Sequence, residues 1–233
     1  LPAGQTLDAQ DVKGSIRKGG QIGLLHWSAN GLTVSARDVQ LEWQPLDLLR
    51  RRLNVSTLKA GELVVDDRRP ASPSAPEPPP EILLPLDIDL ALAVDTIRLT
   101  GATAFEAHGL AARYQYEDQA HQLQITQLAV AQGQYQGTVR LQARLPMALD
   151  LQLAGQVQAP VGNGQTMALD ASATANGPLA GMAPRLELQV LVQPGAGNSG
   201  ALAGNRAMRA DLSAQVNPWA PQPVIRAQAS FNQ

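Results

Sequence analysis

The fold is decided by residues 135–157, YQGTVRLQARLPMALDLQLAGQV, in which apolar and polar side chains alternate. Every odd-numbered position is apolar or glycine, and most even-numbered positions carry Gln, Arg, Thr or Asp. A side-chain period of two is typical of a β-strand with one apolar face and one solvated face. Pro146 cannot donate a hydrogen bond to a ladder, so it indicates the turn between two strands. Each strand has about 12 residues and a length of roughly 40 Å, about twice the usual value.

The same alternation recurs along most of the chain. Apolar residues occupy every second position of 86–94 and then shift phase before Ile97, and a similar shift separates Ile125 from Leu128. A phase change inside one strand requires a bulge or a bend, which curves the sheet. Connections are mostly short, so about 14 strands should pair with their neighbours in an antiparallel meander. The sequence therefore predicts an all-β fold, a long antiparallel meander.

Two segments differ from the strands. Residues 45–52 predict one short helix, because Pro45 suits its first position and the three arginines at 50–52 suit the negative end of its dipole. Residues 67–85 contain seven prolines among Ser and Glu, which predicts a solvated loop or linker whose deletion should cost little stability. The expected organisation is an N-terminal β segment at 1–66, a Pro-rich loop at 67–85, and a continuation of the repeating β structure at 86–233.

The composition limits the class of protein. Hydrophobic residues make up 44% and charged residues 16% of the chain, which indicates a folded protein. The net charge of −2 gives no electrostatic support for a nucleic-acid partner. Aromatic residues are only 3%, so a thick, dry core is not expected. The absence of cysteine fits either chance or a protein of an oxidising compartment. No apolar run approaches 18 residues, so neither a signal peptide nor a membrane span is expected.

The sequence contains few groups that could perform chemistry. The three histidines lie far apart, and no metal-ligand spacing, phosphate-binding loop or nucleophile motif occurs. We therefore expect no catalytic residues, no metal site, no cofactor and no enzymatic activity. Arg50, Arg51 and Arg52 have two interpretations: contact with phospholipid headgroups, or favourable charge at the end of the short helix.

One block of the chain resembles a known family. It consists of VKGSI at 12–16, GL at 23–24, GLTVSA at 31–36, LEWQPLDLL at 41–49 and LNVSTL at 53–58, followed by the Pro-rich acidic loop and LPL at 84–86. This block is similar to the periplasmic part of the TamB family, close to its N-terminal membrane anchor. The likeness is most specific in residues 12–65, and LxWxPLxLL is its sharpest part.

The resemblance implies a fold, a location and partners. It implies a sheet curled into an open groove shaped like a taco shell, with an apolar concave face. It also implies a periplasmic location, an inner-membrane anchor and an outer-membrane partner of the TamA type. The family moves phospholipid between the two membranes or helps to assemble outer-membrane proteins. The family's anchor helix and C-terminal domain have no counterpart in these residues, and no individual site residue transfers from the resemblance.

The residues themselves point to an apolar binding surface. Long strands with one apolar face and no helices to cover it leave a large exposed patch, which is typical of a binding site. Phospholipid acyl chains suit such a patch because they need apolar area rather than directed polar contacts. The alternative is a structural β-scaffold that supports outer-membrane protein assembly without binding lipid. The residues expected to line the groove are Leu86, Ile88, Leu90, Leu92, Leu123, Ile125, Val139, Leu141, Met147, Leu149, Leu151, Leu153, Met167 and Leu169.

Overall fold

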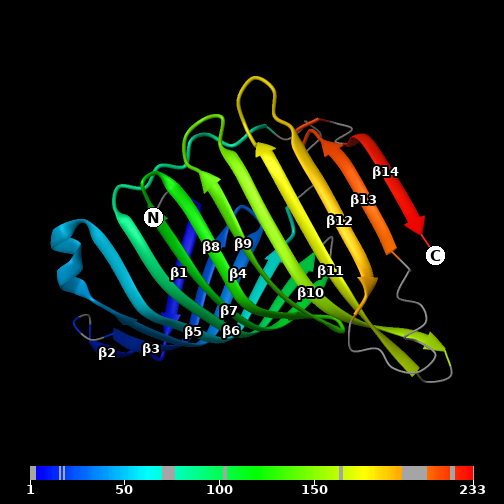
Figure 1. Ribbon diagram of the computed structural model, residues 1–233. Helices are drawn as coiled ribbons and strands as arrows, with labels where there is room; N and C mark the ends of the chain where they lie inside the picture. The colour runs from blue at the N-terminus through cyan, green and yellow to red at the C-terminus, as the bar shows by residue number, and fades with distance from the viewer. Residues whose placement is uncertain are drawn as a thin grey trace. The chain divides into compact units, whose positions relative to one another are not determined.

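The computed structural model describes residues 4–15, 17, 19–69, 77–101, 104–162, 165–195, 209–220 and 224–232. These residues form fourteen strands and one short helix (Figure 1). The strands are β1 (Gln5–Gln10), β2 (Lys13–Ser15), β3 (Gly19–Ala29), β4 (Leu32–Trp43), β5 (Arg52–Asp67), β6 (Asp87–Gly101), β7 (Phe105–Glu117), β8 (Ala120–Val130), β9 (Gly133–Gln142), β10 (Ala148–Gly162), β11 (Gln165–Pro178), β12 (Leu186–Pro194), β13 (Arg209–Val216) and β14 (Val224–Asn232). No helix in the described ranges is long and apolar enough to cross a bilayer.

All fourteen strands belong to one sheet, and their order follows the chain. β1 pairs with β3, each later strand pairs with the next, and β2 pairs with β3 outside this path. The order ends at β1 and β14 without a pairing between them, so the sheet is an open meander rather than a closed barrel. The predicted all-β meander is therefore confirmed.

The pairing of β5 with β6 differs from the prediction. These two strands are parallel, with Arg52 opposite Asp87 and Asp67 opposite Gly101. The expectation that all neighbours pair antiparallel is wrong here, because the chain must return along the whole of β5 before β6 can begin. Parallel strands need such a crossover connection. The Pro-rich segment supplies it, and seven of its residues, 70–76, lie outside the described ranges.

Part of this connection is attached to the sheet. Residues 77–84 have no regular secondary structure. The backbone N–H of Ile82 nevertheless donates to the carbonyl of Ala143 at 2.9 Å, and the Ile82 carbonyl lies 2.8 Å from His121 Nε2. The division of the chain at 67–85 stays a prediction.

The predicted helix is present as a 3₁₀ helix, η1 (Pro45–Arg50). Proline stands in its first turn, as expected. Arg51 ends the helix in the left-handed region, at φ 58°, and its N–H donates to the carbonyls of Asp47 and Leu48. The hydrogen bond from Arg51 to Leu48 joins residues three positions apart, which is the pattern of the tighter 3₁₀ geometry. The element ends at Arg50, whereas the sequence predicts a helix over 45–52.

The phase changes in the sequence mark irregular positions that lie opposite one another in β3 to β7. The register has no pair at Gly23, Asp38, Gly61, Asp95 and Gly109, although the flanking residues are paired. Asp38 and Gly109 have φ values of 52° and 59°, which interrupt the alternation of side chains. A Cβ on Gly61 would lie 3.4 Å from Asp38 Oδ2. The phase shift expected before Ile97 thus coincides with an irregular position, and the irregular positions form one row across β3 to β7; the bend expected between Ile125 and Leu128 stays a prediction.

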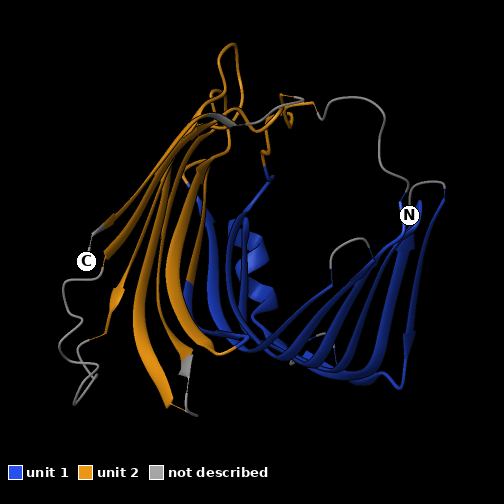
Figure 2. Ribbon diagram, turned by 90° about the vertical axis from the view of Figure 1, so that its right-hand side faces the viewer, with its two compact units in different colours: residues 1–71, 84–117, 125–131 blue, residues 72–83, 118–124, 132–233 orange. Residues whose placement is uncertain are grey.

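The chain divides into two compact units, coloured separately in Figure 2. Unit 1 comprises residues 1–71, 84–117 and 125–131, and unit 2 comprises residues 72–83, 118–124 and 132–233. Each described core is small. The buried apolar residues are Val39, Val55, Val94, Ala107, Ala112 and Tyr116 in unit 1, and Ala120, Ala143, Met147, Met167, Ala175, Ala180 and Leu186 in unit 2. Both sets agree with the prediction that the chain does not build a thick core.

Candidate functional site

The sheet of unit 2 separates apolar and polar side chains onto opposite faces. Residues directly opposite on neighbouring strands share a face, because side chains alternate with a period of two along each strand. Three rows of paired positions on one face are therefore apolar or glycine from β9 to β14. They are Val139, Leu151, Ala175, Leu188, Ala214 and Ala227; Gly137, Leu153, Ala173, Val190, Leu212 and Ala229; and Tyr135, Gly155, Ala171, Val192, Ala210 and Phe231. We call these rows the apolar face of unit 2.

The apolar face of unit 2 is incompletely covered. Leu149, Leu151 and Leu153 are half-buried, whereas Gln152 on the other face is exposed. Leu212 and Phe231, on β13 and β14, keep 44% and 79% of their surface accessible. A face packed against a second sheet would bury such side chains fully. The apolar area therefore remains available for contact.

Tyr135 lies flat on this face instead of standing out from it. Its ring occupies the space above Gly155, where a Cβ would meet Tyr135 Cδ1, and it extends over Gly133, where a Cβ would lie 2.6 Å from the hydroxyl oxygen. Tyr135 and Gly155 are direct cross-strand partners. The two glycines therefore allow an aromatic side chain to add apolar area without blocking the rows on either side of it.

The apolar residues of unit 1 form shorter rows around the irregular positions. Trp43, Val55, Leu90 and Tyr114 are paired in turn across β4 to β7, and Leu41, Leu58, Leu92 and Ala112 form the next row. The apolar positions of a strand change phase at the irregular row, and the apolar residues on both sides of that row therefore remain on the same face. On β6, for example, Val94 precedes the irregular Asp95, and Ile97 and Leu99 follow it. These rows form the apolar face of unit 1.

The structure places the expected groove-lining residues in three groups. Val139, Leu141, Leu149, Leu151, Leu153 and Leu169 lie together on the apolar face of unit 2. Ile88, Leu90 and Leu92 lie on the apolar face of unit 1, and half-buried Leu86 precedes β6. Leu123 and Ile125 alternate with exposed residues on β8. Their role as lipid contacts stays a prediction.

Met147 does not lie on an accessible surface. It is fully buried, at 0% exposure, and it follows the cis peptide bond between Leu145 and Pro146. Its N–H donates to the Arg144 carbonyl at 2.7 Å, and its carbonyl accepts from the Leu179 N–H at 3.1 Å. Met147 precedes β10 and has φ 55°, so it is not part of the strand, although its odd number matches the apolar positions of β10. The expectation that Met147 lines the groove is corrected accordingly. Met167 is also nearly buried, at 8% exposure.

The sequence-based set omits the apolar residues of β12 and β13. Leu188, Val190 and Leu212 continue the rows of Leu151 and Leu153 without interruption. The signal was present, because these strands show the same period of two. The sequence does not contain the strand register that places Leu188, Val190 and Leu212 in line with the leucines of β10, across the alanines of β11.

The opposite face of unit 1 carries a ladder of ion pairs. Arg37 contacts Glu62 Oε2 at 2.7 Å, Arg98 contacts Glu62 Oε1 at 2.6 Å, and the guanidinium of Arg98 lies 3.7 Å from Glu106. Arg113 donates to both carboxylate oxygens of Asp89, at 2.7 and 2.6 Å, and these bonds hold the pKa of Asp89 below its ordinary value. This face is suited to water rather than to lipid.

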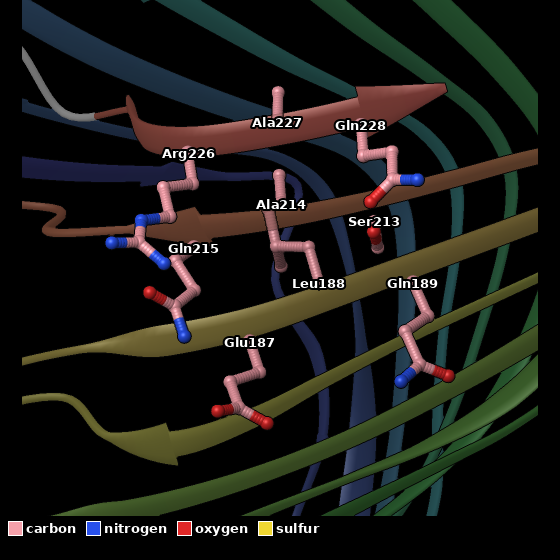
Figure 3. A pocket seen from close by; sticks show the side chains of 9 residues that line it. All are labelled: Glu187, Leu188, Gln189, Ser213, Ala214, Gln215, Arg226, Ala227 and Gln228. Carbon is pink, nitrogen blue, oxygen red and sulfur yellow. The ribbon is translucent and has the colours of Figure 1, made fainter. Parts of the chain in front are cut away.

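The polar face of unit 2 contains an open hollow of about 490 Å³ across β12, β13 and β14. Figure 3 shows its two polar rows, in which the side chains project away from Ala214 and Ala227. The rows are Glu187, Gln215 and Arg226, and Gln189, Ser213 and Gln228. Amides and hydroxyls in this arrangement suit contact with water, and no buried polar side chain of the described residues lacks a partner.

Titratable groups do not converge in the described part of the chain. Those residues contain no group of three or more His, Cys, Asp or Glu side chains that could hold a metal ion. His26 bonds to Ser35 at 2.9 Å and His108 lies 3.3 Å from Glu106, both on the ladder face of unit 1. The most extensive feature with binding potential is therefore the pair of apolar faces.

One comparison with known proteins gave a match. Residues 69–193 match a family model described as TamB, N-terminal domain, which covers more than half of the 233 residues. The matched range begins beyond residues 12–65, where the sequence resemblance is most specific, so the two observations come from different parts of the chain. No curated protein and no solved structure matches.

Proposed function

The chain belongs to the TamB family of the Gram-negative cell envelope, and on this premise we propose that it carries phospholipid acyl chains along its apolar faces. In this proposal it is a periplasmic segment of a bridge-type lipid transfer protein acting between the inner and outer membranes. Its role is binding and transport rather than catalysis. The inner-membrane anchor and the TamA-type partner that the family implies are not assigned to any residue of this chain.

The observation that carries the proposal is the set of continuous apolar rows with half-exposed leucines. Neighbouring strands are about 4.8 Å apart, so a chain lying along a row meets another apolar residue or a glycine at each such step. Removing methylene groups from water contributes about 0.8 kcal/mol for each CH₂. A row can therefore hold an acyl chain through many small contributions, without directed polar contacts.

The same geometry supports movement of the bound chain. No residue of the three rows offers a charge, and neighbouring positions along a row are chemically similar. A bound acyl chain can then shift by one strand spacing with little change in its contacts. The solvated ladder face of unit 1 and the polar face of unit 2 would remain in water.

The experiment uses adjacent positions on opposite faces of β10. A photo-crosslinking amino acid is placed at Leu151 or, as the matched control, at Gln152, and the purified chain is irradiated with phospholipid vesicles. We expect phospholipid adducts in the mass spectrum of the Leu151 variant and few in that of the Gln152 variant. Equal labelling at both positions, or none at Leu151, would support the alternative of a structural β-scaffold that does not bind lipid.

A further inference from the structure

The helix η1 exposes leucines to an unusual degree. Leu46, Leu48 and Leu49 keep 76%, 41% and 85% of their surface accessible, and no residue of the helix is buried. A 3₁₀ helix has three residues per turn, so side chains three positions apart are eclipsed. Leu46 and Leu49 therefore form one ridge. We call the three residues the leucine tip.

Polar contacts on the other side of η1 hold the leucine tip outward. Asp47 accepts a hydrogen bond from Asn54 Nδ2 at 3.2 Å, and the Gln44 N–H donates to the Asn54 carbonyl at 2.9 Å. These contacts join η1 and its N-cap residue Gln44 to Asn54, near the start of β5. The helix stands where β4 ends and β5 begins, at a strand-end edge of unit 1 (Figure 1). The exposure of the leucines is thus fixed by the fold of the connection.

A free cation stands beside the tip. Arg51 donates to the Pro85 carbonyl at 3.1 Å, and Arg52 lies 3.4 Å from Glu117. Within the described ranges Arg50 has no hydrogen-bond or ion-pair partner, and it is exposed. Asp47 and Arg50 share one edge of the helix, but the Asp47 carboxylate bonds with Asn54. Arg50 is therefore available to an anion outside the chain.

We propose that the leucine tip inserts into the interfacial region of a bilayer that contains anionic phospholipid, with Arg50 at a headgroup phosphate. Exposed leucines next to a basic side chain are typical of segments that lie in the membrane interface. A projecting helix needs no complementary pocket to enter a fluid surface. The inference is separate from lipid carriage, because it concerns docking to an intact bilayer and none of the apolar rows.

The absence of cysteine permits a direct test. Leu49→Cys is labelled with an environment-sensitive nitrobenzoxadiazole dye, and Met182→Cys serves as the matched control, since Met182 is a fully exposed apolar residue between β11 and β12. Vesicles of phosphatidylglycerol and phosphatidylcholine are then added. We expect a blue shift and a severalfold increase in emission from position 49 only. No change at position 49, or equal changes at both positions, would overturn the proposal.

A flotation assay separates the contribution of the leucine tip from that of Arg50. Leu46→Ser with Leu49→Ser should reduce the vesicle-bound fraction severalfold, whereas Met182→Ser should not change it. Arg50→Gln should reduce binding to vesicles with phosphatidylglycerol and leave binding to pure phosphatidylcholine as it was. Circular dichroism verifies that each variant is folded. Unchanged flotation of a folded double serine variant would refute membrane docking and would indicate that the leucines contact a protein partner instead.

Discussion

Units 1 and 2 build the same kind of two-faced sheet by different means. The strands β9 to β14 of unit 2 keep one alternation over most of their length, with register shifts near the ends of β10 and β13. They are joined in antiparallel pairs and use alanine and glycine beside leucine on the apolar face. The strands of unit 1 contain a row of irregular positions, a parallel pair and an ion-pair ladder. The fold of unit 2 therefore depends mainly on local alternation, whereas the fold of unit 1 depends on constraints between segments distant in sequence.

The largest expected effect comes from the connection that makes β5 and β6 parallel. β5 has 16 residues and a length of about 50 Å, and the chain must return along it from Asp67 to Asp87. Deleting residues 70–81 leaves seven residues, which span at most about 25 Å. We expect the parallel pairing to be lost and unit 1 to unfold, as shown by loss of most β signal in circular dichroism and by proteolysis.

The matched control keeps the length of that connection and changes its composition. Replacing residues 70–81 with twelve Gly and Ser residues should leave the fold intact, with stability lowered by about 1–2 kcal/mol because a flexible chain loses more entropy when it is ordered. A folded deletion variant would contradict the crossover requirement. The expectation from the sequence that this segment can be deleted at little cost applies to a loop whose ends are close, and the ends of this one are far apart.

The apolar face of unit 2 should tolerate a charge, because it is incompletely covered. Leu151 is half-buried, so the carboxylate of Leu151→Asp stays partly hydrated, and the cost should be about 1–2 kcal/mol. A carboxylate buried against a second layer would cost several kcal/mol. We expect a folded protein with less co-purified phospholipid in native mass spectra. Gln152→Asp is the control and should change neither property; collapse of the Leu151 variant would show that the face is covered.

A smaller effect tests the flat position of Tyr135. A side chain at Gly155 would displace the tyrosine ring and would also place its Cβ 2.6 Å from the Gln134 carbonyl oxygen, so Gly155→Val should lower the free energy of unfolding by about 1–3 kcal/mol in urea titrations. Ala154→Val, on the other face of the same strand, should change it by less than about 0.5 kcal/mol. Equal effects of the two substitutions would mean that the ring does not depend on the glycine.

The sequence was sufficient for the strands but not for their register. Alternation from Leu149 to Leu153 predicts a strand and its apolar face, and the phase shift before Ile97 predicts a bend, because both follow from the period of two. Met147 has the same phase and is buried, because the turn before β10 changes its direction. The parallel pairing of β5 and β6 depends on contacts between segments distant in sequence, and the exposure of the η1 leucines depends on contacts with Asn54; the alternation contains neither.

The smallest predicted effect concerns the ion pairs of unit 1. The Arg113 bonds lower the pKa of Asp89, so the folded carboxylate releases its proton more readily than the unfolded one, whose pKa is about 3.9. The pair therefore contributes stability above about pH 4, and this contribution is lost as the pH falls through the lower folded pKa.

Arg113→Gln should lower the free energy of unfolding by about 0.5–1 kcal/mol at pH 7, a typical value for a partly exposed pair. The difference between parent and variant should shrink as the pH falls below about 4, toward the lowered folded pKa of Asp89. Arg140→Gln on β9 is the control, because Arg140 is exposed and forms no ion pair with the described residues. A difference that stays constant from pH 7 to pH 2 would show that Arg113 acts through its packing along β7 and not through the charge of Asp89.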